Sequence, residues 1–183
     1  MRRDLVEAAR RGDHEAFEVL ATSAGDRLYA VARLILRSAD LAEDALQEAL
    51  VRAWQQLPSL RDPDKFDAWL HRLVVNACAD QGRQLRRWSM QVRPLALEPS
   101  IADDTGSIAD RDQLERGFSR LKPDQRAVIV LHYYSGYPAA EIARILGIPE
   151  GTARSRLHYA TEALRAALEA DERQPAVAEK RTA

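Results

Sequence analysis

The sequence predicts an all-α protein built from two small helical domains that are joined by an acidic linker. Among its 183 residues, glycine and proline each occur only eight times, and alternating runs of β-branched residues are almost absent. Apolar residues instead recur at spacings of three and four, which is the period of an amphipathic helix. This periodicity fails between Arg93 and Gln113, so we expect two helical units with a linker between them.

The overall composition limits the kinds of site that the chain can hold. With 27 basic and 28 acidic residues, any contact with nucleic acid must depend on local clusters of charge. The N-terminus lacks the continuous apolar segment of a signal peptide, and no run of about 18 uncharged apolar residues occurs, so we expect a cytoplasmic protein. The four histidines have no second ligand at helical spacing, and we expect neither a metal site nor a cofactor.

The single cysteine, Cys78, cannot form a disulfide within the chain. It lies in the apolar run LVVNACA, where it is expected to be a small core residue, with a redox switch as the alternative.

The N-terminal unit is expected to contain four helices. Gly12 and Asp13 separate a short opening helix from a long second one, and Ser38 offers a cap for a third. A loop follows at residues 58–65, and Phe66 then begins a fourth helix with a continuous apolar stripe. The inner face of the third helix is expected to consist of Leu41, Ala45, Leu46, Ala49, Ala53 and Leu57.

Two polar surfaces stand out on these helices. The outer face of the third helix carries a patch at spacings of three, four and seven, made of Asp44, Gln47, Glu48 and Val51. It is either a solvated acidic face or a docking surface for a basic partner helix. The end of the fourth helix carries the most concentrated positive patch, made of Arg83, Arg86 and Arg87 beside Trp88. Such a patch suits phosphate contacts and base stacking, although cations at a helix C-terminus are the alternative explanation.

The linker is strongly acidic. Residues 98–115 contain six acidic side chains against one arginine, a net charge of −5. Such a segment stays hydrated and marks a domain boundary. The tail that follows Glu169 has no apolar face and is expected to be disordered.

After the linker, two helices around Pro123 precede a predicted helix-turn-helix at residues 138–168. Gly147 can adopt the left-handed backbone that ends a helix, and Pro149 suits the start of the next one. The second helix has an inner face made of Ala153, Leu157, Ala160, Thr161, Leu164 and Leu168. Its opposite side carries donors and acceptors near the helix N-terminus, where a recognition helix enters the major groove, although a solvated face is the alternative.

The order of these motifs resembles that of the extracytoplasmic-function (ECF) sigma factors, which belong to the sigma-70 family. The resemblance covers about residues 5–170 and rests on AEDALQEALVRAW, FDAWLHRLVVNACADQGR and LKPDQRAVIVLHYYSGYPAAEIARILGIPEGTARSRLHYATEAL. It implies that residues 1–93 form region 2, which docks on core RNA polymerase and melts the minus-10 element. Residues 94–112 would be a flexible linker, residues 113–170 would be region 4, and residues 171–183 would be a disordered tail.

The same resemblance implies roles for individual residues. Docking on the polymerase is assigned to the acidic patch, Asp44, Gln47, Glu48 and Val51. Contacts with the minus-10 element are assigned to Ser59, Leu60, Arg61, Asp62, Arg72, Asn76, Arg83, Arg86 and Arg87. Contacts with the minus-35 element are assigned to Thr152, Arg154, Ser155, Arg156, His158 and Tyr159. Core polymerase, promoter DNA and an anti-sigma factor, often one held at the inner membrane, are the partners that the resemblance implies.

No catalytic group is expected, because the sequence offers no nucleophile with a base, no carboxylate dyad and no glycine-rich phosphate loop. Two positions depart from the family. Pro149 stands where a capping residue is common, and Tyr159 stands where many members have arginine, so the preferred minus-35 sequence should differ at that base. The alternatives are a helix-turn-helix regulator that acts without polymerase and a helical module that binds only protein.

Overall fold

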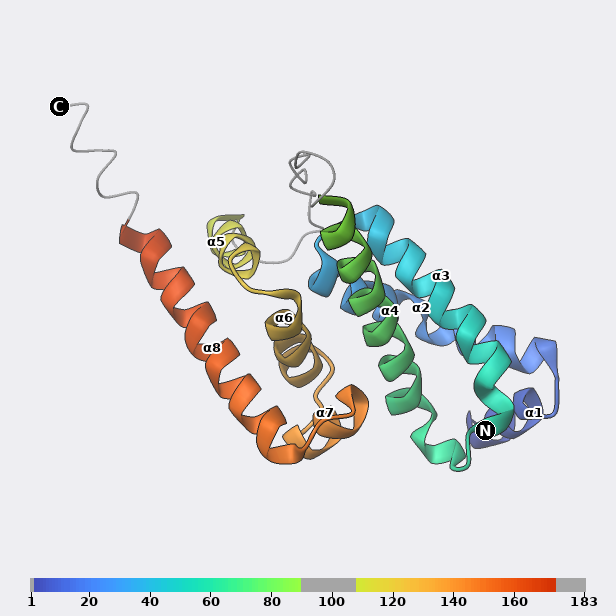
Figure 1. Ribbon diagram of the computed structural model, residues 1–183. Helices are drawn as coiled ribbons and strands as arrows, with labels where there is room; N and C mark the ends of the chain where they lie inside the picture. Colours follow the sequence, from blue (N-terminus) through green and yellow to red (C-terminus); the bar gives the residue numbers. More distant parts are fainter. Residues whose placement is uncertain (1, 90–107, 174–183) are drawn as a thin grey trace.

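The structure, a computed structural model, describes residues 2–89 and 108–173, in which it contains helices and no strand, and of residues 85–89, 108–112 and 171–173 it describes only the backbone. The predicted all-α class is confirmed, and Figure 1 shows two groups of helices side by side. The N-terminal bundle consists of α1 (Arg2–Arg10), α2 (His14–Leu36), α3 (Ala39–Gln56), the 3-10 turns η1 (Leu57–Ser59) and η2 (Pro63–Lys65), and α4 (Phe66–Ser89). The C-terminal bundle consists of α5 (Ile108–Ser119), α6 (Pro123–Ile129), the π-helical turn η3 (Val130–Tyr134), α7 (Ala139–Leu146) and α8 (Glu150–Arg173).

Local signals in the sequence set several helix boundaries. The Asp13 carboxylate accepts a hydrogen bond from Ala16 N at 3.1 Å and caps α2. Ser38 Oγ accepts one from Leu41 N at 3.4 Å and caps α3, as its position in the sequence predicted. Pro123 occupies the first turn of α6, where a missing N–H costs nothing.

A stripe of small side chains forms the inner face of α3. Its four alanines, Ala42, Ala45, Ala49 and Ala53, are all 0% exposed. Leu41 and Leu46, which were expected on the inner face, are only partly buried at the edge of the core. Ala42, which was not expected there, is fully buried instead. Methyl side chains let α2 and α4 approach α3 closely, since the distance between packed helices depends on the side chains at the contact.

The C-terminal bundle is centred on α8, against which α5, α6 and α7 all pack. A Cβ placed on Gly117 of α5 would lie 2.9 Å from Cδ2 of Leu168, so the leucine side chains of α8 pack directly on the backbone of α5 there. Helix α5 begins at Ile108, ahead of the expected boundary at 113, and α8 continues to Arg173, beyond the expected end at 170. The rest of the predicted linker and tail lies outside the described residues.

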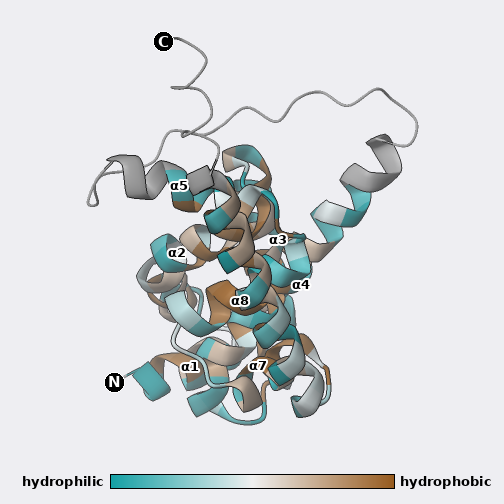
Figure 2. Ribbon diagram, turned by 90° about the vertical axis from the view of Figure 1, so that its left-hand side faces the viewer, coloured by the Kyte–Doolittle hydropathy of each residue, from teal (hydrophilic) through white to brown (hydrophobic). Residues whose placement is uncertain are grey.

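The two bundles also pack against each other, which the sequence did not predict. Helix α4 lies beside α7, and α2 lies beside α6 and η3. Arg27 Nη2 of α2 donates to the carbonyl oxygen of Ser135 at 3.0 Å, which joins residues 108 positions apart. In Figure 2, teal polar residues lie on much of the outward surface of α2 and α8, and brown apolar residues lie toward the interior. None of the helices within the described ranges is both long and apolar enough to cross a lipid bilayer.

Candidate nucleic-acid interface

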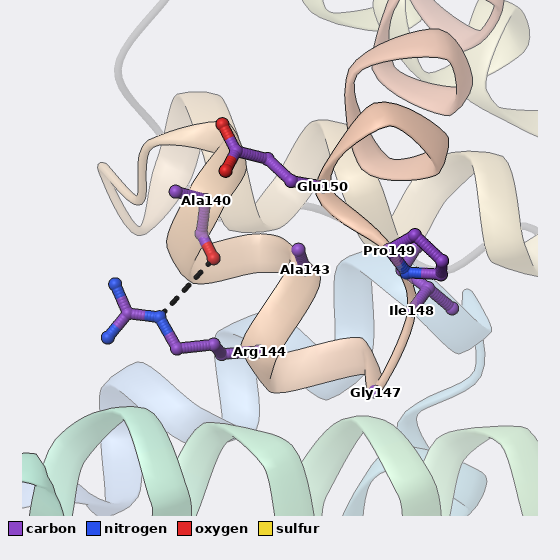
Figure 3. A pocket seen from close by; sticks show the side chains of 7 residues that line it. All are labelled: Ala140, Ala143, Arg144, Gly147, Ile148, Pro149 and Glu150. Carbon is purple, nitrogen blue, oxygen red and sulfur yellow. Dashed lines mark hydrogen bonds between the residues drawn. The ribbon is translucent and has the colours of Figure 1, made fainter.

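The corner between α7 and α8 has the geometry that its sequence predicted. Gly147 has φ 65° and ψ 37°, the left-handed conformation that ends α7. Ile148 N then donates to Ala143 O at 3.0 Å, and Pro149 O accepts from Ala153 N at 3.0 Å at the start of α8. A shallow groove of about 540 Å³ opens beside this corner, as Figure 3 shows, with Arg144 on one side and Glu150 on the other.

Helix α8 buries one side and exposes the other, as expected of a recognition helix. Ala153 and Ala160 are 1% and 0% exposed, whereas Tyr159 is 68% exposed. Of the side chains predicted to contact the minus-35 element, Thr152 is half-buried and the others are exposed, namely Arg154, Ser155, Arg156, His158 and Tyr159. The outward face therefore offers hydrogen-bond donors and acceptors over about two turns near the helix N-terminus.

Two side chains of this face already have partners within α8. Arg154 forms an ion pair with Glu150, one turn earlier, and Ser155 Oγ donates to Thr152 O at 3.0 Å. Both pairs are exposed at the helix surface, where they can exchange for contacts with a ligand at low cost.

The acidic patch lies on the exposed side of α3. Asp44, Gln47 and Val51 are exposed, and Val51 at 57% is one of the most exposed large apolar residues in the described part of the chain. Glu48 is half-buried and accepts a hydrogen bond from Arg52 Nη2 at 2.5 Å. An apolar side chain on the same helix face as two carboxylates is the pattern expected of a surface that binds a basic amphipathic helix.

Arg52 connects this patch to α4. Its Nη1 donates to Asp80 at 3.0 Å, and Asp80 also accepts from Arg83. The hydrogen bond to Asp80 is the largest cause that raises the pKa of Arg52, against a smaller opposing effect of burial. Partial burial raises the pKa of Asp80, but the hydrogen bonds from Arg83 and Arg52 outweigh it and leave that pKa below its ordinary value.

The loop at residues 58–65 is ordered by its own hydrogen bonds. Ser59 Oγ donates to Gln56 O at 2.6 Å, and the Asp62 carboxylate caps η2 by accepting from Asp64 N at 3.1 Å. Ser59 and Arg61 are exposed. Leu60, expected among the DNA contacts, is only 8% exposed and packs into the core formed by the helices, which removes its apolar side chain from water.

Helix α4 carries the remaining predicted minus-10 residues. Arg72, Asn76 and Arg83 are all exposed, and at 100° per residue they fall within about 40° of one another. They therefore share one face of the helix, about 16 Å long at 1.5 Å per residue. Arg86 and Arg87 follow on the backbone of α4, but their side chains lie outside the described residues.

Residues that the sequence did not single out lie where the bundles meet. His71 is 4% exposed, and its Nδ1 lies 3.2 Å from the hydroxyl oxygen of Tyr137. Burial is the main cause that lowers the pKa of His71. No local pattern could have identified this pair, because the two residues are 66 positions apart. Across the described residues, no group of three or more histidine, cysteine, aspartate or glutamate side chains is arranged to hold a metal ion.

Comparison with known proteins assigns a family segment to each bundle. Residues 20–88 match the family described as Sigma-70 region 2, and residues 111–164 match Sigma-70, region 4. The chain is 37% identical over 153 residues to the ECF RNA polymerase sigma factor SigM of Mycobacterium tuberculosis, a match that covers 84% of this chain and 77% of SigM.

Two solved structures are similar as well. One is the sigma factor RpoE in complex with the anti-sigma factor NepR from Bartonella quintana, with a TM-score of 0.70, 27% identity, and coverage of 85% of this chain and 98% of RpoE. The other is CnrH in complex with the cytosolic domain of CnrY, with a TM-score of 0.67, 28% identity, and coverage of 93% and 98%.

Proposed function

Because the chain belongs to the ECF sigma factors of the sigma-70 family, we propose that its two bundles divide promoter recognition between them. It is an RNA polymerase sigma factor, a DNA-binding protein that binds core polymerase and directs the initiation of transcription. The N-terminal bundle serves core docking and minus-10 melting, and the C-terminal bundle serves minus-35 recognition. The observation that carries this division is that the two family segments, residues 20–88 and 111–164, fall in separate bundles with separate polar faces.

The acidic patch of α3 is the docking surface for core polymerase. Asp44, Gln47, Glu48 and Val51 present carboxylates around an exposed apolar side chain. Asp44 and Gln47 make no side-chain hydrogen bond or ion pair with any described residue, so they meet a partner without first breaking a contact. A basic helical surface on the polymerase is the complementary partner.

The minus-10 element binds at the loop and the exposed face of α4. Ser59, Arg61 and Asp62 surround an extruded base, while buried Leu60 holds the loop in place beneath them. Unstacking a base costs a few kcal/mol, which a shaped pocket with a cationic rim can offset. The rim consists of Arg72, Asn76, Arg83, Arg86 and Arg87, and the three that are described share one face of α4.

The minus-35 element binds the outward face of α8 in the major groove. The contact set is Thr152, Arg154, Ser155, Arg156, His158 and Tyr159. Arginine can make a bidentate contact with guanine, whereas the Tyr159 phenol can make one hydrogen bond to a base edge. The chain supplies recognition only, and the phosphodiester chemistry belongs to the polymerase, so no catalytic residue or cofactor is assigned.

Its place of action and its regulation follow from this role. A sigma factor works on the chromosome with core polymerase, which places it in the cytoplasm. An anti-sigma factor is a further expected partner, since similar structures include the complex of RpoE with NepR. A membrane-held anti-sigma factor would keep the protein near the inner membrane until a signal releases it.

Run-off transcription tests the proposal directly. Purified core polymerase, this protein and a promoter library randomised in both elements should give discrete transcripts from a subset of sequences that share two motifs. The variant Asp44→Lys should bind core polymerase weakly and yield little transcript. Binding to duplex DNA without binding to polymerase would instead indicate a helix-turn-helix regulator, and the absence of any DNA-dependent signal would indicate a protein-binding module.

A further inference from the structure

Two polar links cross the contact between the two bundles, beside apolar packing that joins their cores. The hydroxyl oxygen of Tyr137, just before α7, lies 3.2 Å from Nδ1 of His71 on α4. Their rings meet edge to face, with centroids 5.2 Å apart and an interplanar angle of 81°. Beside them, Arg27 donates to the Ser135 carbonyl oxygen at 3.0 Å. Both links reach the segment between η3 and α7, so this short segment is held by two helices of the other bundle.

The surroundings of His71 determine where its proton lies. Nδ1 is 2.8 Å from the carbonyl oxygen of Asp67, which can only accept, so Nδ1 carries the hydrogen and shares it between Asp67 O and the Tyr137 hydroxyl oxygen. Nε2 is then a buried acceptor with no partner among the described residues. A neutral ring fits this site, because a second proton at Nε2 would leave an unpaired, charged N–H out of contact with water.

The charges around the pair do not favour a cationic histidine. Burial lowers the pKa of His71, the backbone hydrogen bond to Asp67 raises it by less, and Arg27 of α2 lowers it further. Burial raises the pKa of the Tyr137 hydroxyl, and Asp67 and Glu141 of α7 raise it further, while Arg27 and Arg2 of α1 lower it. The backbone carbonyl oxygen of Tyr137 accepts a hydrogen bond from Nδ1 of His132 of η3 at 2.9 Å. The nearby carboxylate of Asp67 is exposed and paired with Arg2, so it offers the ring little compensation.

The seam, meaning the contact between the two bundles, also lies beside one end of the surface that is proposed to bind minus-10 DNA. Nη2 of Arg72, the residue next to His71, lies 4.0 Å from where a Cβ on Gly147 would be, so the helix-turn-helix corner reaches the Arg72 end of the minus-10 face, while Arg72, Asn76 and Arg83 stay exposed. By their positions, the minus-10 and minus-35 elements are about 25 base pairs apart, which is about 85 Å along B-DNA at 3.4 Å per base pair. Surfaces in contact cannot reach both elements at once, so the bundles must separate before a promoter is bound.

We propose that the His71–Tyr137 pair is a latch that holds region 4 beside the Arg72 end of the minus-10 face of region 2 in the free protein, and that protonation of His71 opens it. The part of this inference that concerns access of DNA to α4 rests on the proposed function. The latch itself rests only on the contacts between the two bundles. Since the neutral ring is bound in the closed state and the charged ring is not, closure is stable at neutral pH. It is lost as the pH falls through the lowered pKa of His71.

Small-angle X-ray scattering of the full chain tests the latch at about pH 7.5 and about pH 5, where an ordinary histidine is mostly neutral and mostly charged. These values lie on either side of the isoelectric point of about 6.4, where solubility is lowest. The wild type should expand at the lower pH. The variant His71→Phe, which cannot be protonated, should keep one radius of gyration at both. The exposed His14 provides the matched control, since His14→Phe should expand as the wild type does.

The variant Tyr137→Phe keeps the ring and removes the hydroxyl group. It should raise the ratio of open to closed protein about 2- to 10-fold at neutral pH, the effect of one net hydrogen bond. If His71→Phe does not fold, proton NMR of the wild type replaces it, because the His71 ring signal should titrate below the ordinary value of about 6.5 and in step with the expansion. A wild type whose radius stays constant between the two pH values would overturn the latch, as would an expansion that His71→Phe leaves unchanged.

Fluorescence anisotropy with a labelled single-stranded minus-10 oligonucleotide separates the latch from the proposed function. Tyr137→Phe should bind it about 2- to 10-fold more tightly than the wild type at neutral pH, if opening gives the strand access to the Arg72 end of the α4 face. Expansion on acidification without any oligonucleotide binding would count against the minus-10 assignment and support the latch. Oligonucleotide binding with no change in radius would support the assignment and count against the latch.

Discussion

Arg52 and Asp80 join α3 to α4 through a hydrogen bond of 3.0 Å between Nη1 and a carboxylate oxygen. Arg52 also pairs with Glu48 on the docking side, and Asp80 pairs with Arg83 on the DNA side. The variant Asp80→Asn should lower the free energy of unfolding by about 0.5–1 kcal/mol at neutral pH, since such partly exposed pairs contribute little individually and more as a network. Urea denaturation followed by circular dichroism measures the difference.

The pH dependence of this variant supplies its control. Hydrogen bonds from two arginines hold the pKa of Asp80 below its ordinary value despite partial burial, so its contribution is present above the unfolded pKa of about 3.9. The difference between the wild type and Asp80→Asn should therefore shrink as the pH falls below about 4. A difference that stays constant through this range would show that the carboxylate charge does not matter.

Gly147 should tolerate no side chain without cost. Its φ of 65° lies in the left-handed region, so Gly147→Ala should lower the free energy of unfolding by about 1–2 kcal/mol. Displacement of the corner should also weaken binding to minus-35 DNA. Gly25→Ala is the control, because a Cβ there meets nothing within 4 Å and alanine favours the interior of a helix. Thermal unfolding of both variants measures the difference, and Gly25→Ala should leave the free energy of unfolding unchanged or slightly raised.

Charge reversal in the acidic patch should weaken docking. Asp44→Lys places a cation beside Glu48 and Val51, and we expect the dissociation constant for core polymerase to rise at least about 10-fold, equivalent to about 1.4 kcal/mol. Glu18→Lys makes the same change on the exposed side of α2, away from the patch, and should bind normally. Equal weakening by both variants in surface plasmon resonance would point to overall charge as the cause.

Arg154 should contribute to the affinity for the minus-35 element. If it contacts a base edge, Arg154→Ala should weaken promoter binding by about 1–3 kcal/mol and relax the sequence preference at one position. Arg165→Ala removes another exposed arginine of the same helix, beyond the predicted contact set, and should change affinity little. Tyr159→Arg should shift the preference toward guanine at its base. Competition assays with single-base promoter variants measure this preference. If Tyr159→Arg did not change it, the assignment of Tyr159 to a base contact would be wrong.

Cys78 should be inert toward thiol reagents in the folded protein. It is 1% exposed, and burial raises the pKa of its thiol to about 12. At pH 8 about one thiol in 10⁴ is then ionised, and only the thiolate reacts. Maleimide labelling should be slow in the native state and fast in urea. Rapid labelling without denaturant would revive the redox alternative.

Local signals in the sequence account for much of the fold. Asp13, Ser38, Pro123 and Gly147 act on the backbone within a few residues of themselves, so the helix ends they mark could be predicted. The division of α8 into a buried and an exposed side follows from its period in the same way. These features need no knowledge of distant parts of the chain.

Other features depend on distant partners. Leu60 is buried because a core formed by other helices accepts it, which a loop rich in proline and charge does not indicate. His71 and Tyr137 meet across 66 positions, and Arg52 reaches Asp80 on the next helix, so neither pair follows from helical periodicity. The start of α5 at Ile108 lies inside an acidic segment whose composition predicted a linker.

The four fully buried alanines of α3 have a consequence for how the protein could change over time. A stripe without any spare volume cannot accept a larger side chain unless α2 or α4 moves away, so overpacking should cost about 1–3 kcal/mol at each position. The same spacing holds the acid-faced side of α3 and the arginine-faced side of α4 at a constant separation. Substitutions on the inner face are therefore selected against. Substitutions at solvent-facing positions of both helices are tolerated and can change the partners and the promoter preference of the protein.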